Sequence, residues 1–323
     1  MIENIVEKYS VGALLYSPAL NQTVADSIIE GKFSAPFSLA LCLEDTISDD
    51  MTAISEKMII KTLSRISQEH NIPYLPKIFV RVREPAQIVR LYEGIKDYQD
   101  ILTGFIFPKY SLDNAEQYNV AIRTVNSLSD KRIYMMPILE SSDLISCYGR
   151  PELLKSLKDM MDSIREYILN VRVGGNDFSN VLATRRHMDE TIYSISAISN
   201  LFGDIISVFS EDYVVSGPVW EYFSSENGEW AEGLRAEIKL DRLNGFIGKT
   251  VIHPNQLPIA NEMFMVTKTD YEDAKVILDW DDSSGLRVGK SVNGDRMNEV
   301  RTHFNWAIKI MTLAKIYGVT DEH

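Results

Sequence analysis

The most constraining feature of this chain is a regular alternation of short apolar segments with longer segments of helical periodicity. Eight segments have the apolar or β-branched composition of buried strands: 13–16, 37–43, 77–82, 104–107, 132–138, 169–173, 204–209 and 250–252. Helical periodicity is found between them, at 49–68, 86–98, 112–128, 151–168, 188–200 and 229–244. Strict alternation predicts an α/β fold with a parallel sheet, and eight repeats favour its closure into a (β/α)8 TIM barrel.

Beyond residue 264 the alternation stops. Residues 269–280 have the pattern of a helix with an acidic first turn, and residues 300–317 have that of a last helix. We therefore predict a TIM-barrel catalytic domain over residues 1–266 and a short C-terminal helical extension over residues 267–323. So short an extension buries little surface alone, and we expect it to pack on the barrel or on a neighbouring subunit.

The charge and hydrophobicity of the chain exclude several classes of function. The formal net charge of the 323 residues is -13 at pH 7, and the pI is about 4.9. Such a chain has no overall positive field to attract a phosphate backbone, so we expect no nucleic-acid binding. No apolar run is long enough to span a bilayer, and residues 1–8 lack the pattern of a secretory signal. We expect a cytoplasmic protein that does not bind membranes.

Three of the strand-like segments end in acidic residues. Glu44 and Asp45 follow the second segment, Glu140 follows the fifth and Asp177 follows the sixth. The carboxyl ends of parallel strands meet at one face of a barrel, where such barrels place their chemistry. Oxygen ligands gathered at one place suit a hard divalent cation, and Mg²⁺ is the cofactor that we predict.

Each of these acids also has a simpler explanation. Glu44, Asp45 and Glu140 precede residues that can begin a helix, so they could serve as solvated helix caps. Asp177 follows two glycines, and a bare turn explains that string equally well. Acids that converge on one place, however, repel one another unless a cation or a proton joins them. The convergence of the acids is therefore more informative than any one of them.

Two further strand-like segments end in basic residues. Arg81 lies at the end of the third segment, where its planar guanidinium matches a carboxylate with two parallel hydrogen bonds. The alternative is a surface arginine held by Glu84. Lys109 follows the fourth segment, where it either neutralises an anionic ligand or merely caps the sheet. We favour Arg81 as the anchor of an acidic substrate.

Several stretches of the chain match, in order, the motifs of one protein family. They are Leu14-Leu-Tyr-Ser-Pro18, Cys42-Leu-Glu44-Asp45, Val80-Arg81-Val82, Phe107-Pro-Lys109, Ile138-Leu-Glu140-Ser141, Gly175-Asn-Asp177, Gly245-Phe-Ile-Gly-Lys-Thr-Val-Ile-His253-Pro254 and Asn293-Gly-Asp-Arg-Met297. With these motifs the chain resembles the citrate lyase beta subunit and its relatives, the malyl-CoA and citramalyl-CoA lyases of the HpcH/HpaI aldolase group. It also looks like a divergent branch of these lyases that accompanies bacterial tellurium-resistance gene clusters.

The resemblance implies roles for the residues at the strand ends. In this family the barrel is often trimeric, and the acids that match Glu140 and Asp177 hold magnesium. The resemblance places Glu44 and Asp45 near the metal, through water, as catalytic residues. It places Arg81 on the carboxylate of the substrate, where it serves both binding and catalysis.

Further site residues follow from the same resemblance. Lys109, Gly175 and Asn176 belong to matching motifs, and we predict that they border the substrate. The family's tail covers the active site, sometimes that of an adjacent subunit, and can supply an acid. Glu299 or Asp295 would fill that place in this chain, and the motifs leave the choice between them open.

The leading functional prediction is a magnesium-dependent carbon–carbon lyase that cleaves or condenses a hydroxy or oxo acid by aldol or Claisen chemistry. The expected partners are a small oxo or hydroxy acid, either free or as a coenzyme A thioester, and copies of the same chain, with a homotrimer favoured. Relatives that use coenzyme A carry an Arg-Ser pair where this chain has Gly12-Ala13, which weakens the case for a thioester. Two alternatives remain open: a metal- or ligand-binding member of a biosynthetic complex without lyase activity, and a thioester hydrolase that uses the same pocket.

Overall fold

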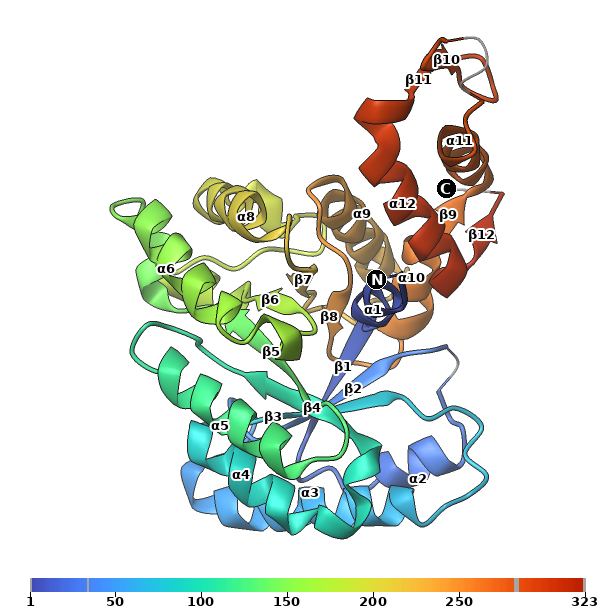
Figure 1. The fold of residues 1–323 in the computed structure, drawn as a ribbon. Helices are drawn as coiled ribbons and strands as arrows, with labels where there is room; N and C mark the ends of the chain where they lie inside the picture. Colours follow the sequence, from blue (N-terminus) through green and yellow to red (C-terminus); the bar gives the residue numbers. More distant parts are fainter. Residues whose placement is uncertain (1, 34, 282–284, 322–323) are drawn as a thin grey trace. The chain divides into compact units, whose positions relative to one another are not determined.

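The computed structural model describes residues 2–33, 35–281 and 285–321 (Figure 1). The chain forms two compact units. The larger unit is Val11–Ala260, and the smaller one combines Met1–Ser10 with Asn261–His323. The sequence predicts a catalytic domain that ends at residue 266. Whether an independent catalytic domain ends there stays a prediction.

The larger unit is a closed barrel of parallel strands, which confirms the predicted TIM-barrel fold. Consecutive strands pair in parallel, and the last strand pairs with the first, so that the ring has no free edge. The strands are β1 (Ala13–Pro18), β2 (Ser38–Cys42), β3 (Lys77–Arg81), β4 (Leu102–Phe107), β5 (Tyr134–Leu139), β6 (Val171–Val173), β7 (Val215–Val219) and β8 (Lys249–Val251).

Helices surround the ring of strands (Figure 1). The α-helices of this unit are α2 (Val24–Ile29), α3 (Thr52–Ser67), α4 (Pro85–Gly94), α5 (Ala115–Leu128), α6 (Arg150–Asp162), α7 (Asn176–Val181), α8 (Ser196–Phe209) and α9 (Glu229–Leu243), and α10 (Gln256–Phe264) runs across the border between the units. Short 3₁₀ turns are found at Asp49–Met51, Lys96–Ile101, Ser142–Ile145, Arg165–Tyr167 and Ile192–Ser194. Each longer helix buries one apolar stripe; α3, for example, buries Ile59, Leu63 and Ile66.

The seventh predicted strand was wrong. Residues 204–209 form the end of helix α8, and the seventh strand is β7, Val215–Val219. The buried residues of α8 include Leu201, Ile205 and Phe209, which recur every four residues and mark one face of a helix. The helix expected over residues 188–200 is correspondingly displaced, since α8 begins at Ser196.

The register of the barrel decides which side chains point inward. Cys42 on β2 pairs with Arg81 on β3, and Ile138 on β5 pairs with Arg172 on β6, so paired residues share a side of the sheet. An apolar cluster that includes Leu14, Ala40, Phe79, Ile106 and Met136 fills the middle of the barrel. The inward arginines Arg81 and Arg172 lie beyond this cluster, toward the carboxyl ends of their strands.

The smaller unit is built mainly of two helices, α11 (Lys268–Leu278) and α12 (Val300–Tyr317), which pack on each other. Helix α12 agrees with the predicted last helix. The other elements are α1 (Ile2–Tyr9), the parallel pair β9 (Val266–Thr267) and β12 (Val319–Thr320), and the antiparallel pair β10 (Val288–Lys290) and β11 (Met297–Glu299). The hydroxyl of Tyr317 donates a hydrogen bond to the carbonyl of Tyr9 over 2.8 Å, which ties α1 to α12.

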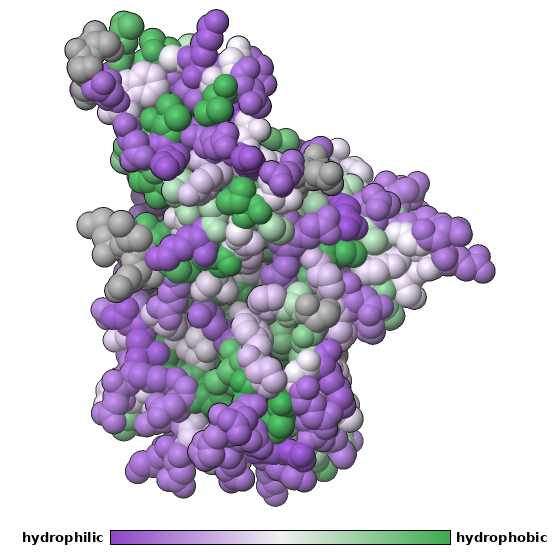
Figure 2. All heavy atoms as spheres, turned by 90° about the vertical axis from the view of Figure 1, so that its right-hand side faces the viewer, coloured by the Kyte–Doolittle hydropathy of each residue, from purple (hydrophilic) through white to green (hydrophobic). Residues whose placement is uncertain are grey.

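The surface drawn in Figure 2 is largely hydrophilic, with hydrophobic residues in small scattered groups. Within residues 2–33, 35–281 and 285–321, no helix is long and apolar enough to cross a membrane.

Candidate active site

The carboxyl ends of the barrel strands enclose a cavity of about 250 Å³. Inward-facing residues of the strands line it together with the loops that follow β2, β5, β6 and β8. The lining residues are Tyr16, Cys42, Asp45, Thr46, Arg81, Ile138, Glu140, Arg172, Val173, Gly174, Gly175, Asn176, Asp177, Val219, Thr250 and Ile252. Asp45, Arg81, Glu140, Gly175, Asn176 and Asp177, all predicted as site residues, thus share one cavity, although their roles stay predictions.

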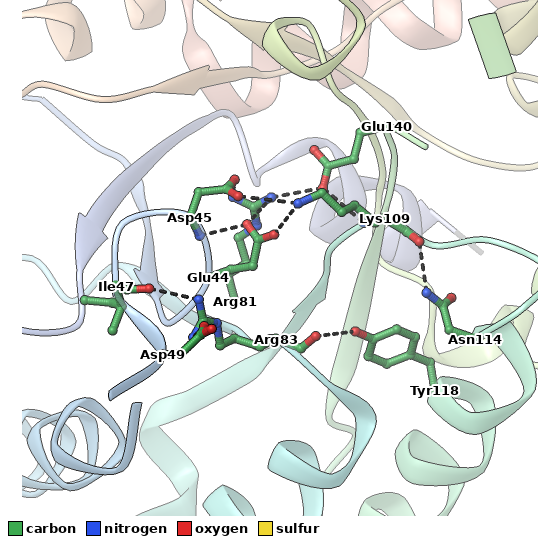
Figure 3. Close-up of polar contacts among 10 residues, drawn as sticks. All are labelled: Glu44, Asp45, Ile47, Asp49, Arg81, Arg83, Lys109, Asn114, Tyr118 and Glu140. Atoms are coloured by element: carbon green, nitrogen blue, oxygen red, sulfur yellow. Dashed lines mark hydrogen bonds and ion pairs between the residues drawn. The ribbon is translucent and has the colours of Figure 1, made fainter. Parts of the chain in front are cut away.

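Arg81 is the centre of an ionic network at the edge of this cavity (Figure 3). Its Nη1 atom lies 3.0 Å from Asp45 Oδ2, and its Nη2 atom lies 2.9 Å from both Glu44 Oε2 and Glu140 Oε1. The guanidinium is buried, with the residue 7% exposed. In this structure Arg81 therefore holds three acids from two different strand ends, and both of its Nη atoms are engaged by protein.

Lys109 supplies a second positive charge to the same acids (Figure 3). Its Nζ atom lies 2.6 Å from Glu44 Oε1 and 3.4 Å from Asp45 Oδ1, and its backbone N–H donates to Glu140 Oε1 over 3.0 Å. The residue has a φ of 48°, a left-handed conformation that is uncommon for lysine. The amide of Asn114 donates to the Lys109 carbonyl over 3.0 Å and so holds this turn.

Arg83, next to this network, has a structural role. It lies beyond β3 and binds the loop after β2: its Nη1 atom is 3.0 Å from Thr52 Oγ1, and its Nη2 atom is 2.9 Å from the carbonyl of Ile47. Figure 3 shows the contact of Arg83 with Ile47, together with its ion pair to Asp49, in which Nη1 lies 2.7 Å from Oδ1. Arg83 thereby fixes the loop that carries Glu44 and Asp45.

Glu140 is buried, with 5% of the residue exposed, at the point where β5 ends. Burial raises the pKa of its carboxyl to about 7, with Asp177 and Glu44 adding to the shift and Arg81 opposing it. The neighbouring strand comes very close, because a Cβ on Gly174 would lie 2.4 Å from the Glu140 Cβ. Gly174 is therefore the residue that lets the end of β6 pass against Glu140.

Asp177 lies in the first turn of α7, directly after β6. Asp177 is close enough to Glu140 for its charge to raise the pKa of the Glu140 carboxyl. In the part of the chain that the structure describes, no three His, Cys, Asp or Glu side chains are grouped so that they could hold a metal ion together. A cation here would accordingly rest on two carboxylates, a number of protein ligands that suits Mg²⁺, which usually keeps several waters.

Sequence analysis missed two polar residues inside the barrel mouth, Arg172 and Tyr16. Arg172 is 1% exposed, and its Nη2 atom donates to Thr250 Oγ1 over 2.6 Å. The Tyr16 ring lies beside Arg81, 5.8 Å from the guanidinium carbon to the ring centre. The signal for Arg172 was in the sequence: Asn170 and Arg172 are two polar residues at alternate positions in an otherwise apolar strand.

The predicted tail acids lie in the smaller unit. Asp295 Oδ1 accepts a hydrogen bond from the Ser291 hydroxyl over 2.7 Å. Glu299 ends β11, and its Oε2 atom accepts one from the Thr302 hydroxyl over 2.6 Å. Their assignment as active-site acids stays a prediction.

Comparison with known proteins identifies the family. The model of the C-C_Bond_Lyase family, of the TIM-barrel fold, matches residues 5–319. The chain belongs to this family, and the resemblance to the citrate lyase beta subunit group is confirmed.

Individual relatives are more distant. A (3S)-malyl-CoA thioesterase of Cereibacter sphaeroides is 32% identical over 100 residues, 31% of this chain. The chain thus matches 32% of the length of that relative.

Solved structures show the same fold. One is CitE of Mycobacterium tuberculosis in complex with magnesium, acetoacetate and coenzyme A, with a TM-score of 0.60 and 15% identity over 95% of this chain and 99% of that one. Another is the citrate lyase beta subunit from M. tuberculosis complexed with oxaloacetate and magnesium, with a TM-score of 0.52 and 16% identity over 80% and 98% of the two chains. RipC from Yersinia pestis has a TM-score of 0.54 and 13% identity over 81% and 98%.

Proposed function

We propose that the protein is a magnesium-dependent carbon–carbon lyase that cleaves or forms a bond in a hydroxy or oxo acid. The observation that carries this proposal is the position of Glu140 and Asp177 at the ends of adjacent strands, both lining the cavity that contains Arg81. Membership of the C-C_Bond_Lyase family supports it. So do the complexes of structural neighbours with magnesium and oxo acids.

Glu140 and Asp177 are the residues that would hold the cation. The Oε1 atom of Glu140 accepts two hydrogen bonds, one from Arg81 and one from the backbone N–H of Lys109. This leaves Oε2 as the oxygen of Glu140 that would be available to a cation. Magnesium held by Glu140 and Asp177 would supply Lewis-acid stabilisation of the negative charge that develops on a substrate oxygen.

The remaining chemistry belongs to the side chains of this chain. In cleavage, the O–H bond of the hydroxy acid and the neighbouring C–C bond break, a C=O bond forms, and the C–C electron pair leaves with the other fragment as an enolate, which then takes up a proton. A base must accept the hydroxyl proton. Asp45 lines the cavity and stays ionised: burial alone would raise the pKa of its carboxyl, but its interaction with the Glu44 carboxyl and the charges of Arg81 and Lys109 outweigh burial and lower the pKa. We assign Asp45 this role, acting through a water molecule.

The test uses the purified protein with Mg²⁺ and a panel of hydroxy acids, oxo acids and their coenzyme A thioesters. Release of pyruvate, glyoxylate or oxaloacetate is followed together with free thiol. We expect Glu140→Gln and Asp177→Asn each to abolish magnesium-dependent carbon–carbon cleavage while the melting temperature stays close to that of the wild type. Asp143→Asn is the matched control, because Asp143 is an exposed acid three residues after Glu140. Full activity in both site variants would refute the proposal.

The second candidate function is thioester hydrolysis in the same cavity. The observation that favours it is the curated relative from C. sphaeroides, which is a (3S)-malyl-CoA thioesterase. The same panel separates the two functions: free thiol without an oxo acid indicates hydrolysis, whereas an oxo acid indicates carbon–carbon cleavage. The cavity of about 250 Å³ accommodates a small acid by itself. A thioester would need its coenzyme A portion to extend beyond it.

A further inference from the structure

The barrel mouth contains a second guanidinium whose charge no acid of the site neutralises. Arg172 lies on β6 with its side chain on the inner face, because it pairs with the inward Ile138. It lines the same cavity as Glu140 and Asp177. Its Nη2 atom donates to Thr250, whereas Nε and Nη1 are buried without a well-formed hydrogen bond among the described residues, although the Tyr16 hydroxyl lies close enough to favour the charged guanidinium.

Arg172 and Arg81 differ in what surrounds them. Ion pairs join Arg81 to Glu44, Asp45 and Glu140, whereas Arg172 has no ion pair within the described part of the chain. Burial lowers the pKa of Arg172, the hydroxyl of Tyr16 opposes this shift, and the charge of Arg81 adds to it. Burial of a guanidinium with unpaired N–H donors destabilises the fold unless an anion accepts hydrogen bonds from those donors.

The charges that line the cavity show which anion is missing. With Glu140 ionised, as it would be when it holds a cation, Asp45, Glu140 and Asp177 contribute three negative charges, and Arg81 and Arg172 contribute two positive charges, which leaves one net negative charge. Glu44 and Lys109 cancel each other at the edge. A divalent cation brings the total to one positive charge, which one carboxylate neutralises.

We propose that Arg172, rather than Arg81, is the guanidinium that binds the carboxylate of the substrate acid. The proposal rests on the proposed function, because it assigns the acid to the same cavity. Arg81 then acts as a positioning residue that holds the three acids, and Arg172 donates from Nε or Nη1 to the ligand. A hydrogen bond between charged groups in a buried site is strong, and its loss should weaken binding at least tenfold.

The test measures binding rather than turnover. Pyruvate and glyoxylate are titrated into the protein at saturating Mg²⁺, and Mg²⁺ is titrated separately, both by calorimetry. We expect Arg172→Met to weaken binding of the two acids by about tenfold to a hundredfold, with Mg²⁺ affinity within about threefold of the wild type. Arg172→Lys keeps a charge but loses the planar fork. It should therefore bind the acids more tightly than Arg172→Met and more weakly than the wild type. Arg65→Gln, a substitution on the exposed face of α3, serves as the control.

A second readout separates a binding role from a structural one. Because Arg172 is buried without a counter-ion, Arg172→Met should leave the melting temperature unchanged or raise it by about 2–5 °C. A strong loss of thermal stability would show that the guanidinium serves the fold, and it would overturn the proposal.

The outcomes also distinguish this proposal from the one on which it rests. If Glu140→Gln leaves Mg²⁺ binding intact, or if the wild type binds neither acid, the proposed function fails and the assignment of Arg172 fails with it. If Mg²⁺ binding depends on Glu140 but Arg172→Met binds the acids as tightly as the wild type, the metal site stands and the assignment of Arg172 is wrong.

Discussion

The Nη2 atom of Arg81 lies 2.9 Å from the Oε1 atom of Glu140, although 59 positions separate the two residues in the sequence. The contact joins the end of β3 to the end of β5, with β4 between them. Both residues are buried, and loss of either partner would leave an unpaired charge that destabilises the folded protein. The spacing of the acids at the mouth of the barrel therefore depends on one guanidinium.

Replacing Arg81 should destabilise the protein strongly. Arg81→Gln leaves Glu44 and Glu140 buried without their shared counter-charge, and we expect the free energy of unfolding to fall by about 3–5 kcal/mol. Urea unfolding at pH 7 with a chelator present measures this loss. Added Mg²⁺ should restore part of it, because a cation can replace the missing charge.

The surface variant Arg65→Gln, expected to change stability by less than about 0.5 kcal/mol, is the reference for this comparison. An Arg81→Gln protein as stable as that reference would show that the acids do not need the guanidinium.

Gly174→Ala should disturb the acids that we propose to bind the metal, without removing any polar group. The new Cβ would lie 2.4 Å from the Glu140 Cβ, so either the end of β6 or Glu140 must move. We expect Mg²⁺ affinity, measured by calorimetry, to fall at least about tenfold, since a shift of an ångström spoils a two-carboxylate site.

Gly203→Ala is the matched control for this change. Nothing lies within 4 Å of a Cβ at Gly203, which sits inside helix α8. The alanine should raise stability by about 0.5–1 kcal/mol and leave Mg²⁺ affinity unaltered. Equal Mg²⁺ affinities in the two variants would mean that the close approach of Gly174 to Glu140 has no influence on the site.

Most of the fold could be predicted because the barrel strands are buried on both sides and therefore read as apolar runs. The exception is the seventh strand. Residues 204–209 are as apolar and β-branched as a strand, but they are the last turns of α8, whereas β7 contains Gly217 and Pro218, which are rare in strands. Local composition cannot separate a short buried strand from the apolar face of a helix.

The candidate site was predictable to the extent that it obeys one rule, that acids and bases at the carboxyl ends of parallel strands converge. Glu44, Lys109 and Glu140 follow this rule and do meet. Arg172 lies inside its strand rather than after it, and only the closed barrel turns that position toward the cavity. Pairing partners at such distances in sequence are not encoded in any local pattern.

A second buried ionic cluster supports β8 from outside the cavity. Lys249 is 0% exposed, and its Nζ atom lies 2.7 Å from Glu237 Oε1 and 2.8 Å from Asp241 Oδ2. Lys249→Met should lower the free energy of unfolding at pH 8 by about 3–5 kcal/mol, because it removes the counter-charge of buried Asp241 and leaves buried Glu237 paired with Arg186 alone among the described residues.

The loss caused by Lys249→Met should shrink as the pH falls. Burial, together with Glu237 and against the charge of Lys249, raises the pKa of Asp241 to about 6 in the folded protein. Lys249 lowers this pKa, so the pKa of Asp241 rises further in the variant. Lowering the pH from 8 to 5.5 therefore protonates Asp241 and stabilises the folded variant more than the folded wild type. Unfolding curves of wild type and variant at the two pH values test this, and a loss that is the same at both would contradict it.

Asp162, at the end of α6, should produce the opposite dependence on pH. Its carboxylate lies 2.8 Å from Lys158 Nζ and from Arg165 Nη2, and it accepts a hydrogen bond from the Tyr213 hydroxyl over 2.5 Å. Burial alone would raise its pKa, but these partners outweigh it and lower the pKa to about 2. The stability that the partners provide is therefore complete above about pH 4 and is lost as the pH falls from 4 to 2.

Asp162→Asn should remove this contribution, which solvent screening keeps to about 0.5–1 kcal/mol at pH 7. Wild type and variant should differ by that amount in urea unfolding at pH 7 and converge as the pH approaches 2. Asp159→Asn, at an exposed position one turn earlier in α6, should follow the wild type throughout. A protonated carboxyl and an amide carry the same charge. If the difference in the free energy of unfolding between wild type and Asp162→Asn stays unchanged at pH 2, Asp162 contributes through packing and not through the charge of its carboxylate.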